Sequence, residues 1–341
     1  MVFVEMKNTV LFLILILVTA CSESFKNDPI GDSGRTKRTE NLLANLRTQA
    51  DTAGFLLGHA DDTLYGVGWQ QEKGRSDIMS VVNDLPALLT LDISGVETSR
   101  KVNSVGISLQ AVRAAAMEHF DKGGVVLLSW NSSHRLSADD LDVAADSIAA
   151  FLKGLVMPYG VRVPVLFRPI ADGKGWTSQL TMDEYRATWH HLIERLRHDD
   201  VVNALFVYSF TSMRSCYPAD DDVDVLELRQ SYDSDQTSAR GLSLSLGKLN
   251  NYCHQHHKLM GLVTGLRGLR TDNWWTKTLA PAIIRLPLAY VALGANSDHA
   301  VGNFYVPYPG QQSAHDFVKF YNLPRTLFLH NVNGIYVTRV Q

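Results

Sequence analysis

The sequence has few cysteines and little net charge. It contains three cysteines in 341 residues, and its formal net charge is −3. A balanced charge gives no basic surface of the kind that binds nucleic acid. The cysteines form no CxxC pair and no Cys/His spacing typical of zinc ligands. We therefore expect no nucleic-acid partner, no metal and no cofactor.

The sequence also lacks a clear disulfide or histidine-rich metal motif. Cys216 is expected on a loop and Cys253 in a helix, which favours two free buried thiols, with a disulfide as the open alternative. His254, His256 and His257 lie on the same predicted helix, and we interpret them as a solvated face.

The only long apolar run is at the N-terminus. Lys7 precedes a run over residues 10–18, which is shorter than the ~20 residues of a membrane-spanning helix. A charged start, a short apolar stretch and small residues predict a secretory signal over residues 1–20. The following L-V-T-A-C resembles a bacterial lipobox, in which Cys21 is lipidated and anchors the protein to the membrane. Ser22, which follows Cys21, is typical of outer-membrane lipoproteins. The alternatives for this N-terminal segment are an ordinary signal peptide and a buried apolar segment.

The rest of the chain alternates between strand-like and helix-like segments. Residues 21–36 are polar with Pro and Gly and predict a flexible tether. Short, continuously apolar segments then predict parallel strands buried on both faces. They lie at residues 55–59, 86–94, 124–130, 163–169, 204–210, 223–229, 258–264 and 288–294. Eight such strands predict a single α/β domain, a (β/α)8 barrel over residues 37–341.

Helical patterns lie between the predicted strands. Thr181 and Glu184 form a capping box, in which each side chain accepts a hydrogen bond from the other residue's backbone N–H group. Further helices are predicted at residues 103–120, 137–155, 241–256 and 311–321. In a barrel of this kind the functional groups lie at the carboxyl ends of the strands.

Polar and aromatic residues follow several of the predicted strands. They are His59, Asp61, Asp62, Trp69, Asp92, Glu97, Trp130, Arg168, Asp172 and Trp176. Hydrogen-bonding groups beside aromatic rings are the composition of a sugar-binding cleft. Individually, each has a simpler interpretation: a tryptophan at a strand end is more often core, and Arg168 can simply hold a buried carboxylate.

Several motifs resemble glycoside hydrolase family 26, the bacterial β-mannanase family. The chain has GHADDTLYG (58–66), GRSD (74–77), LDISGVE (91–97), FRP (167–169), YP-x-D (217–220), WWT (274–276) and NFYVPYPGQQSAHDF (303–317). These motifs occur in the family's order from about residue 40 to 335. The resemblance implies a (β/α)8 barrel with a polysaccharide cleft.

The departures from the family pattern fall on its catalytic residues. By resemblance, the acid/base glutamate corresponds to Asp172, and the nucleophilic glutamate corresponds to Thr264. A cleft Trp-Arg pair corresponds to Gly294 and Ala295, whereas Asn296 is kept. Two further positions differ: a histidine corresponds to Asn131 and, across an uncertain alignment, an aspartate to Arg229.

These replacements predict weak or absent hydrolysis. Retaining glycosidases need two carboxyl groups about 5–5.5 Å apart. Asp172 is one methylene shorter than glutamate, and a misplacement of about 1 Å can cost ~10²-fold in rate. Thr264 without an adjacent base is a poor nucleophile. An inverting route needs a second carboxyl group ~6.5–9.5 Å from the first, for which Asp92, Glu97 and Glu227 are the candidates.

We therefore predict an exported outer-membrane lipoprotein that binds a β-mannan or related polysaccharide without cleaving it. Such a protein could hold polysaccharide for neighbouring polysaccharide-utilisation proteins. The predicted binding residues are His59, Asp61, Asp62, Trp69, Trp130, Arg168, Trp176, Tyr232 and Asn296. Two alternatives remain open: an active endo-β-mannosidase-type hydrolase with Asp172 as its acid, and a non-catalytic protein-interaction module.

Overall fold

The computed structural model describes residues 28–132, 134–171, 175–212, 216–232, 239–297 and 302–338. Within them eight parallel strands form a closed barrel, because the last strand pairs with the first. The barrel strands are β1 (Phe55–Ala60), β4 (Leu88–Asp92), β5 (Val125–Ser129), β6 (Val165–Arg168), β7 (Ala204–Phe210), β8 (Val225–Tyr232), β9 (Leu259–Leu266) and β10 (Leu288–Leu293). All eight predicted strands are confirmed, and with them the (β/α)8 fold.

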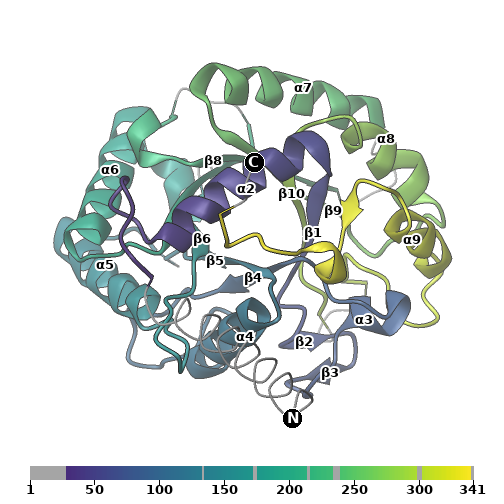
Figure 1. Cartoon of the computed structure of the whole chain (residues 1–341), viewed down its shortest axis with the longest axis horizontal. Coiled ribbons are helices and arrows are strands. Elements are labelled where there is room, and N and C mark those ends of the chain that lie inside the picture. Colours follow the sequence, from purple (N-terminus) through teal and green to yellow (C-terminus); the bar gives the residue numbers. More distant parts are fainter. Residues whose placement is uncertain are drawn as a thin grey trace, which may run out of the picture.

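Helices surround the barrel as a ring (Figure 1). They are α3 (Asp77–Val82), α4 (Leu109–Asp121), α5 (Ala138–Lys153), α6 (Met182–His198), α7 (Ala239–His256), α8 (Ala280–Ile283) and α9 (Ala314–Tyr321). The capping box that opens α6 is present as predicted. Two short strands, β2 (Tyr65–Gly66) and β3 (Trp69–Gln70), form a separate hairpin. The short strand β11 (Thr326–Leu327) pairs with the first two residues of β1.

The helix predicted at residues 103–120 begins later, at Leu109. The Asn103 side chain accepts hydrogen bonds from the backbone N–H groups of Val105 and Ile107, which fixes a loop in front of the helix. Ser108 then caps α4 through the N–H group of Ala111. A short polar side chain can thus compete with the helix for backbone donors.

The strand register determines which side chains face the barrel interior. Glu227 on β8 is level with Ser209 on β7 and with Gly261 on β9, and Gly261 is level with Tyr290 on β10. The Tyr290 hydroxyl contacts Glu227 across the intervening strand, so this layer faces inward. Since side chains alternate along a strand, the neighbouring residues of each strand face the helices.

The amino ends of the strands are closed by α2 (Lys37–Thr52), the purple helix that crosses the middle of the barrel in Figure 1. This helix contacts β7 and β10, which lie on different sides of the barrel. Asn45 on α2 also donates hydrogen bonds to the carbonyl groups of Ile335 and Val337, so the C-terminal segment packs on the same end.

Residues 28–36 are attached to this closed end. Arg35 forms two hydrogen bonds with Asp224, with N–O distances of 2.9 and 2.8 Å, and the N–H group of Thr36 donates to the carbonyl of Val202. Residues 28–36 of the predicted tether are therefore held against the barrel, whereas residues 21–27 and the predicted signal lie outside the described residues.

Cys216 and Cys253 do not form a disulfide, as the sequence favoured. Both side chains are buried. Within the described part of the chain, no helix has the length and apolar character needed to cross a membrane.

We predict that Arg35→Gln lowers the free energy of unfolding by about 1–3 kcal/mol, the range for hydrogen bonds to charged groups. The reason is that Asp224 loses both guanidinium bonds while it remains only 10% exposed. Urea unfolding at pH 7 measures the change. Lys37→Gln, which removes a more exposed ion pair with Glu40, is the matched control and should change stability less. Equal effects of the two substitutions would contradict this role for Arg35.

Candidate functional site: a polar cleft at the barrel mouth

A cleft of about 740 Å³ opens at the carboxyl ends of five barrel strands. We call it the mouth cleft. Its walls and floor include Asp61 after β1, Asp92 and Glu97 after β4, Trp130 and Asn131 after β5, Arg168 and Ala171 at the end of β6, Arg229 on β8, and the rim residue Arg100. The cleft therefore lies where a (β/α)8 barrel places its functional groups. Most of its named side chains are polar or charged.

The floor of the mouth cleft is built on a buried ion pair. Nη1 of Arg168 lies 2.7 and 3.0 Å from the two carboxylate oxygens of Glu227. Ser209 and Tyr290 donate further hydrogen bonds to the same carboxylate, at 2.5 and 2.8 Å. Glu227 is fully buried, and its charge is compensated by residues of β6, β7 and β10.

These contacts decide the ionisation of Glu227. Burial acts to raise the pKa of its carboxyl, but the charges of Arg168 and Arg229 and the bond from Ser209 outweigh burial and hold the pKa below its usual value. The carboxylate is therefore ionised at neutral pH and has its hydrogen-bonding capacity occupied. The sequence offered Glu227 only as a candidate for the second carboxyl group of an inverting route. The structure places it in the barrel interior, as a structural counter-ion beneath the cleft.

The wall formed after β1 and β4 carries three carboxyl groups, each with partners of its own. Asp92 accepts hydrogen bonds from the backbone N–H groups of Ser94 and Ser104 and from the Ser104 hydroxyl. Glu97 accepts from the indole N–H of Trp130 at 3.0 Å and from the N–H of Gly95 at 3.1 Å. These bonds hold the loop after β4 in shape.

Asp61 is the carboxyl group whose environment is most unusual. Burial, followed by the nearby charge of Asp92, raises its pKa to about 7, against the opposing hydrogen bond from the Tyr65 hydroxyl. Its backbone is left-handed, with φ of 55°, which Asp and Asn tolerate better than most residues. One of its carboxyl oxygens is buried without a hydrogen-bond partner among the described residues.

Thr264, which corresponds by resemblance to the family nucleophile, does not line the mouth cleft. Its hydroxyl donates a hydrogen bond of 2.7 Å to the backbone carbonyl of Gln230, and the residue is fully buried. The inward positions at this end of β9 are Val263, level with Arg229, and Gly265, level with Ser231. Neither carries a carboxyl or hydroxyl group. The end of β9 therefore brings no nucleophile to the cleft.

A tyrosine that sequence reasoning missed lies over the ends of β9 and β10. A methyl group added to Gly265 or Gly294 would lie 2.7 Å from a ring carbon of Tyr305, so the ring occupies the space of both missing side chains. The Tyr305 N–H group donates to the side chain of Asn296 at 2.8 Å. The indication in the sequence was the lack of a side chain at Gly265 and Gly294, together with the aromatic residues of the motif at 303–317.

Several predicted binding residues pack behind the cleft instead of lining it. His59 is fully buried and lies 2.6 Å from Asp62, and in the register it faces the helices together with Leu89 and Leu293. Its ring and the Asp62 carboxylate therefore support the turn that places Asp61.

A second group is organised by Asp77 of the GRSD motif. Its carboxylate accepts hydrogen bonds from the indole N–H of Trp69 and from the side-chain amide of Asn296, both at 2.8 Å. This carboxylate joins the β2–β3 hairpin to the loop after β10. Trp69 and Asn296 are both buried. They are structural in this geometry, as is expected of polar groups whose bonds are all internal.

The predicted aromatic platforms are also largely covered. Trp130 borders the mouth cleft, but it is only 1% exposed and its indole N–H is bound to Glu97. Trp176 lines a separate depression against α5 and α6, and Tyr232 at the end of β8 does not line the mouth cleft. Of the nine predicted binding residues, Asp61, Trp130 and Arg168 border this cleft. Asp172 and Cys21 lie outside the described residues.

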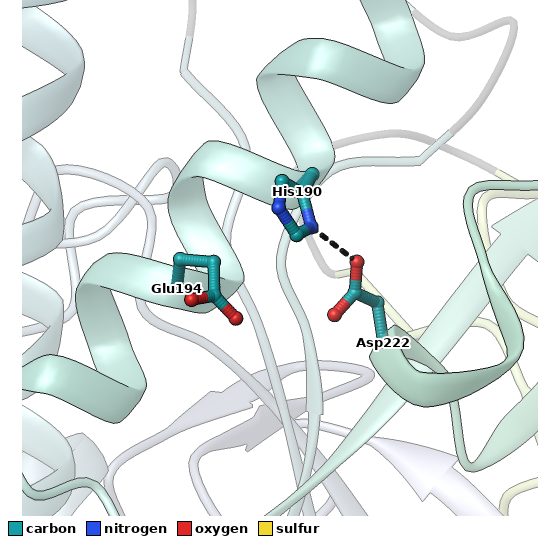
Figure 2. A group of neighbouring side chains, drawn as sticks. All are labelled: His190, Glu194 and Asp222. Carbon is teal, nitrogen blue, oxygen red and sulfur yellow. Dashed lines mark hydrogen bonds and ion pairs between the residues drawn. The ribbon is translucent and has the colours of Figure 1, made fainter.

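A group of possible metal ligands lies on the outside of the barrel. Figure 2 shows His190 and Glu194 of α6 beside Asp222, with the 2.7 Å bond between His190 and Asp222 dashed. Arg197 binds both Glu194 and Asp222, at 3.0 and 2.7 Å. Because a fixed cation already uses these carboxylates, the arrangement is explained as an ion-pair network that attaches α6 to the loop before β8.

The comparisons with known proteins agree with this architecture. The model of the family described as glycosyl hydrolase family 26 matches residues 131–257. A solved β-mannanase of this family from Bacteroides ovatus is 31% identical, with a TM-score of 0.85 over 90% of this chain and 99% of that chain. The catalytic domain of an endo-β-1,4-mannanase from Bacillus sp. JAMB-750 has a TM-score of 0.76 at 23% identity, over 89% of this chain and 95% of that chain, and shows the fold alone.

A curated relative matches a shorter part of the chain. A mannan endo-1,4-β-mannosidase from Bifidobacterium adolescentis is 31% identical over 107 residues, which is 27% of this chain. The match spans only 11% of that longer protein.

We predict that Glu227→Gln lowers the free energy of unfolding by about 3–5 kcal/mol at pH 7, because it leaves buried arginine without its counter-ion. Chemical unfolding measures the change, and Glu118→Gln, which breaks an exposed pair with Lys122, is the control with an expected loss of about 0–1 kcal/mol. Since the folded-state pKa of Glu227 is lowered, its contribution is present above the unfolded pKa and is lost as the pH falls. The difference from wild type should therefore shrink below about pH 4. An unchanged stability at pH 7 would contradict the assigned role.

We predict that Asp61→Asn stabilises the protein increasingly as the pH rises from about 4 to about 7. Over this range the unfolded aspartate is ionised while the folded one retains its proton, so the wild type loses stability as the pH rises. The stability difference should level off above pH 7. Unfolding free energies in urea from pH 4 to 8 measure it, with the exposed Asp51→Asn as control. Parallel profiles for the two variants would show that Asp61 titrates normally.

Proposed function

Because the chain belongs to glycoside hydrolase family 26, we propose that it binds a β-mannan or a related polysaccharide in the mouth cleft and hydrolyses it weakly or not at all. The overall likeness to the Bacteroides ovatus β-mannanase supports the choice of polysaccharide. The mouth cleft, at about 740 Å³, is a suitable size for a few sugar residues and has polar walls.

The observation that carries the non-hydrolytic part is the end of β9. A retaining mechanism needs a carboxylate there, facing a second carboxyl group about 5–5.5 Å away. The inward residues at this place are Val263 and Gly265, and the Thr264 hydroxyl is bound to a backbone carbonyl. Without a nucleophile the covalent step is lost, and general acid–base help alone contributes only about 10²–10⁴-fold.

The carboxyl groups on the opposite wall give limited support to a rebuilt mechanism. Asp92 and Glu97 use their oxygens to hold their own loop. Asp61 favours the alternative of an active hydrolase more than the others do, because a carboxyl group with a pKa of about 7 can donate a proton near neutral pH. The second candidate function is therefore hydrolysis, in which Asp61 or Asp172 acts as the acid.

We further propose that the protein is an exported lipoprotein of the outer membrane, anchored through Cys21, that holds polysaccharide for neighbouring proteins. The position of residues 28–36 supports this. They lie at the closed end of the barrel with α2, at the opposite end of the strands from the mouth cleft. An anchor that precedes them would leave the mouth cleft directed away from the membrane. Labelling with a radioactive fatty acid, lost in Cys21→Ala, tests the anchor.

We predict measurable binding of β-1,4-manno-oligosaccharides by isothermal titration calorimetry, with turnover orders of magnitude below a typical ~10 s⁻¹. Overnight incubation at high protein concentration with counting of new reducing ends measures residual hydrolysis. Thr264→Val is expected to leave both binding and reducing-end release unchanged, because its hydroxyl lies outside the cleft.

Release of reducing ends that is abolished by Asp61→Asn or by Asp172→Asn would replace the binding proposal with the hydrolase alternative. An absence of heat with mannan, glucan and xylan oligosaccharides alike would remove the polysaccharide proposal.

A further inference from the structure

Arg229 is a cation in the mouth cleft that has no direct partner among the residues that the structure describes. It lies two residues after Glu227 on β8, so it faces the barrel interior one layer closer to the mouth, where it lines the cleft. Within the part of the chain that the structure describes, its guanidinium makes no hydrogen bond or ion pair. A guanidinium offers five N–H donors, and a half-buried one without acceptors is costly.

The carboxylate beneath Arg229 is already committed. Glu227 accepts two hydrogen bonds from Arg168 and one each from Ser209 and Tyr290. The floor therefore contains two guanidinium groups and one carboxylate, which leaves an excess positive charge on the cleft side. Burial and then the repulsion from Arg168 lower the pKa of Arg229 to about 10, so it stays charged at neutral pH.

Among the described residues, the acidic wall of the cleft forms no hydrogen bond or ion pair with Arg229. The groups whose charges shift the pKa of Arg229 are Arg168, Glu227 and Tyr290. Asp92 and Glu97 are instead held by donors of their own loop and by Trp130. Arg229 thus lines the cleft as a cation with no hydrogen-bond or ion-pair partner among the described residues, and a guanidinium of this kind can recognise an anionic group on a ligand.

We infer that Arg229 forms a subsite for a negatively charged sugar, so that the preferred ligand of the mouth cleft is an acidic polysaccharide. This inference rests on the proposed function, because it takes the cleft to bind a glycan, and it adds the class of that glycan. A carboxylate, sulfate or phosphate substituent has the oxygens that a guanidinium binds in a bidentate manner.

A β-1,4-linked polymannuronate is the sharpest probe of this inference. It has the linkage and ring stereochemistry of β-1,4-mannan and differs by a carboxylate in place of the C6 hydroxymethyl group. Comparing the two oligomers at equal length isolates the contribution of the charge. A sulfated manno-oligosaccharide distinguishes a sulfate-bearing ligand from a uronic acid, and inorganic phosphate tests whether a free anion suffices.

In calorimetric titrations at pH 7 and low salt, we expect at least one of the two acidic oligomers to bind the wild-type protein roughly 10- to 100-fold more tightly than the neutral one, the factor expected for hydrogen bonds between charged groups. Arg229→Gln should remove this preference, so that the ratio of its affinities for the acidic and neutral oligomers falls to about one. The preference should also decline as the salt concentration rises.

Two controls separate the subsite from general charge and from misfolding. Arg47→Gln removes the same charge from α2 at the closed end of the barrel and should keep the preference. Arg229→Lys keeps the charge without the planar fork and should retain a part of it. Thermal unfolding of Arg229→Gln shows whether the variant folds, because the substitution removes both the repulsion from Arg168 and the attraction to Glu227. If Arg229→Gln does not fold, the acidic subsite is tested instead by the affinities of Arg229→Lys and by the salt dependence of the wild-type preference.

The outcomes of these titrations test the acidic subsite separately from the proposed binding of a polysaccharide. Equal affinity for the neutral and both acidic oligomers would overturn the acidic subsite and leave polysaccharide binding intact. A preference that survives Arg229→Gln would place the recognition elsewhere and would also overturn it. Inorganic phosphate binding as tightly as the acidic oligomers would restrict the site to free anions. Binding of no oligomer at all would remove both proposals.

Discussion

The buried contact between Arg168 and Glu227 is the interaction on which the mouth of this barrel depends. It joins β6 to β8 through the interior, and Ser209 and Tyr290 extend it to β7 and β10. A charged pair in a barrel interior is stable only when every donor and acceptor is satisfied, because desolvation otherwise exceeds the attraction. The geometry of four strand ends is therefore fixed by one carboxylate. The same carboxylate is consequently unavailable for acid–base chemistry in the cleft above it.

The framework around the cleft is held by carboxylates whose hydrogen bonds are internal. Asp77 ties the β2–β3 hairpin to the loop after β10, and the loop after β4 is held by its own carboxylates. At the places where a retaining glycosidase needs charge, β9 offers Val263 and β8 offers Arg229. A site that stabilises a developing positive sugar ring requires negative groups nearby, and these two positions carry none. This supports the proposal that the cleft holds a ligand without cleaving it.

The sequence predicted the candidate site less well than the fold, and the reason is the burial of both strand faces. Most strands in this barrel are largely apolar, so along them an alternation of polar and apolar residues does not indicate which side chains face inward. His59 was assigned to the mouth from its place at a strand end, but it faces the helices. Thr264 was assigned by the family resemblance, but its hydroxyl is bound to a neighbouring backbone carbonyl. Glu227, Arg229 and Tyr305 acquire their positions only through pairing with residues far away in the chain.

The sequence by itself determined the eight strands, the capped start of α6, the family resemblance and the absence of a glutamate in the segment that forms β9. These are local properties, set by short apolar runs and by side chains that bond their own backbone. Only the tertiary structure decided which residues meet. Barrel closure and register place Glu227 level with Ser209 and beneath Arg229, and they bring Tyr305 over Gly265 and Gly294. Inward or outward orientation depends on a one-residue difference in register, which no local pattern records.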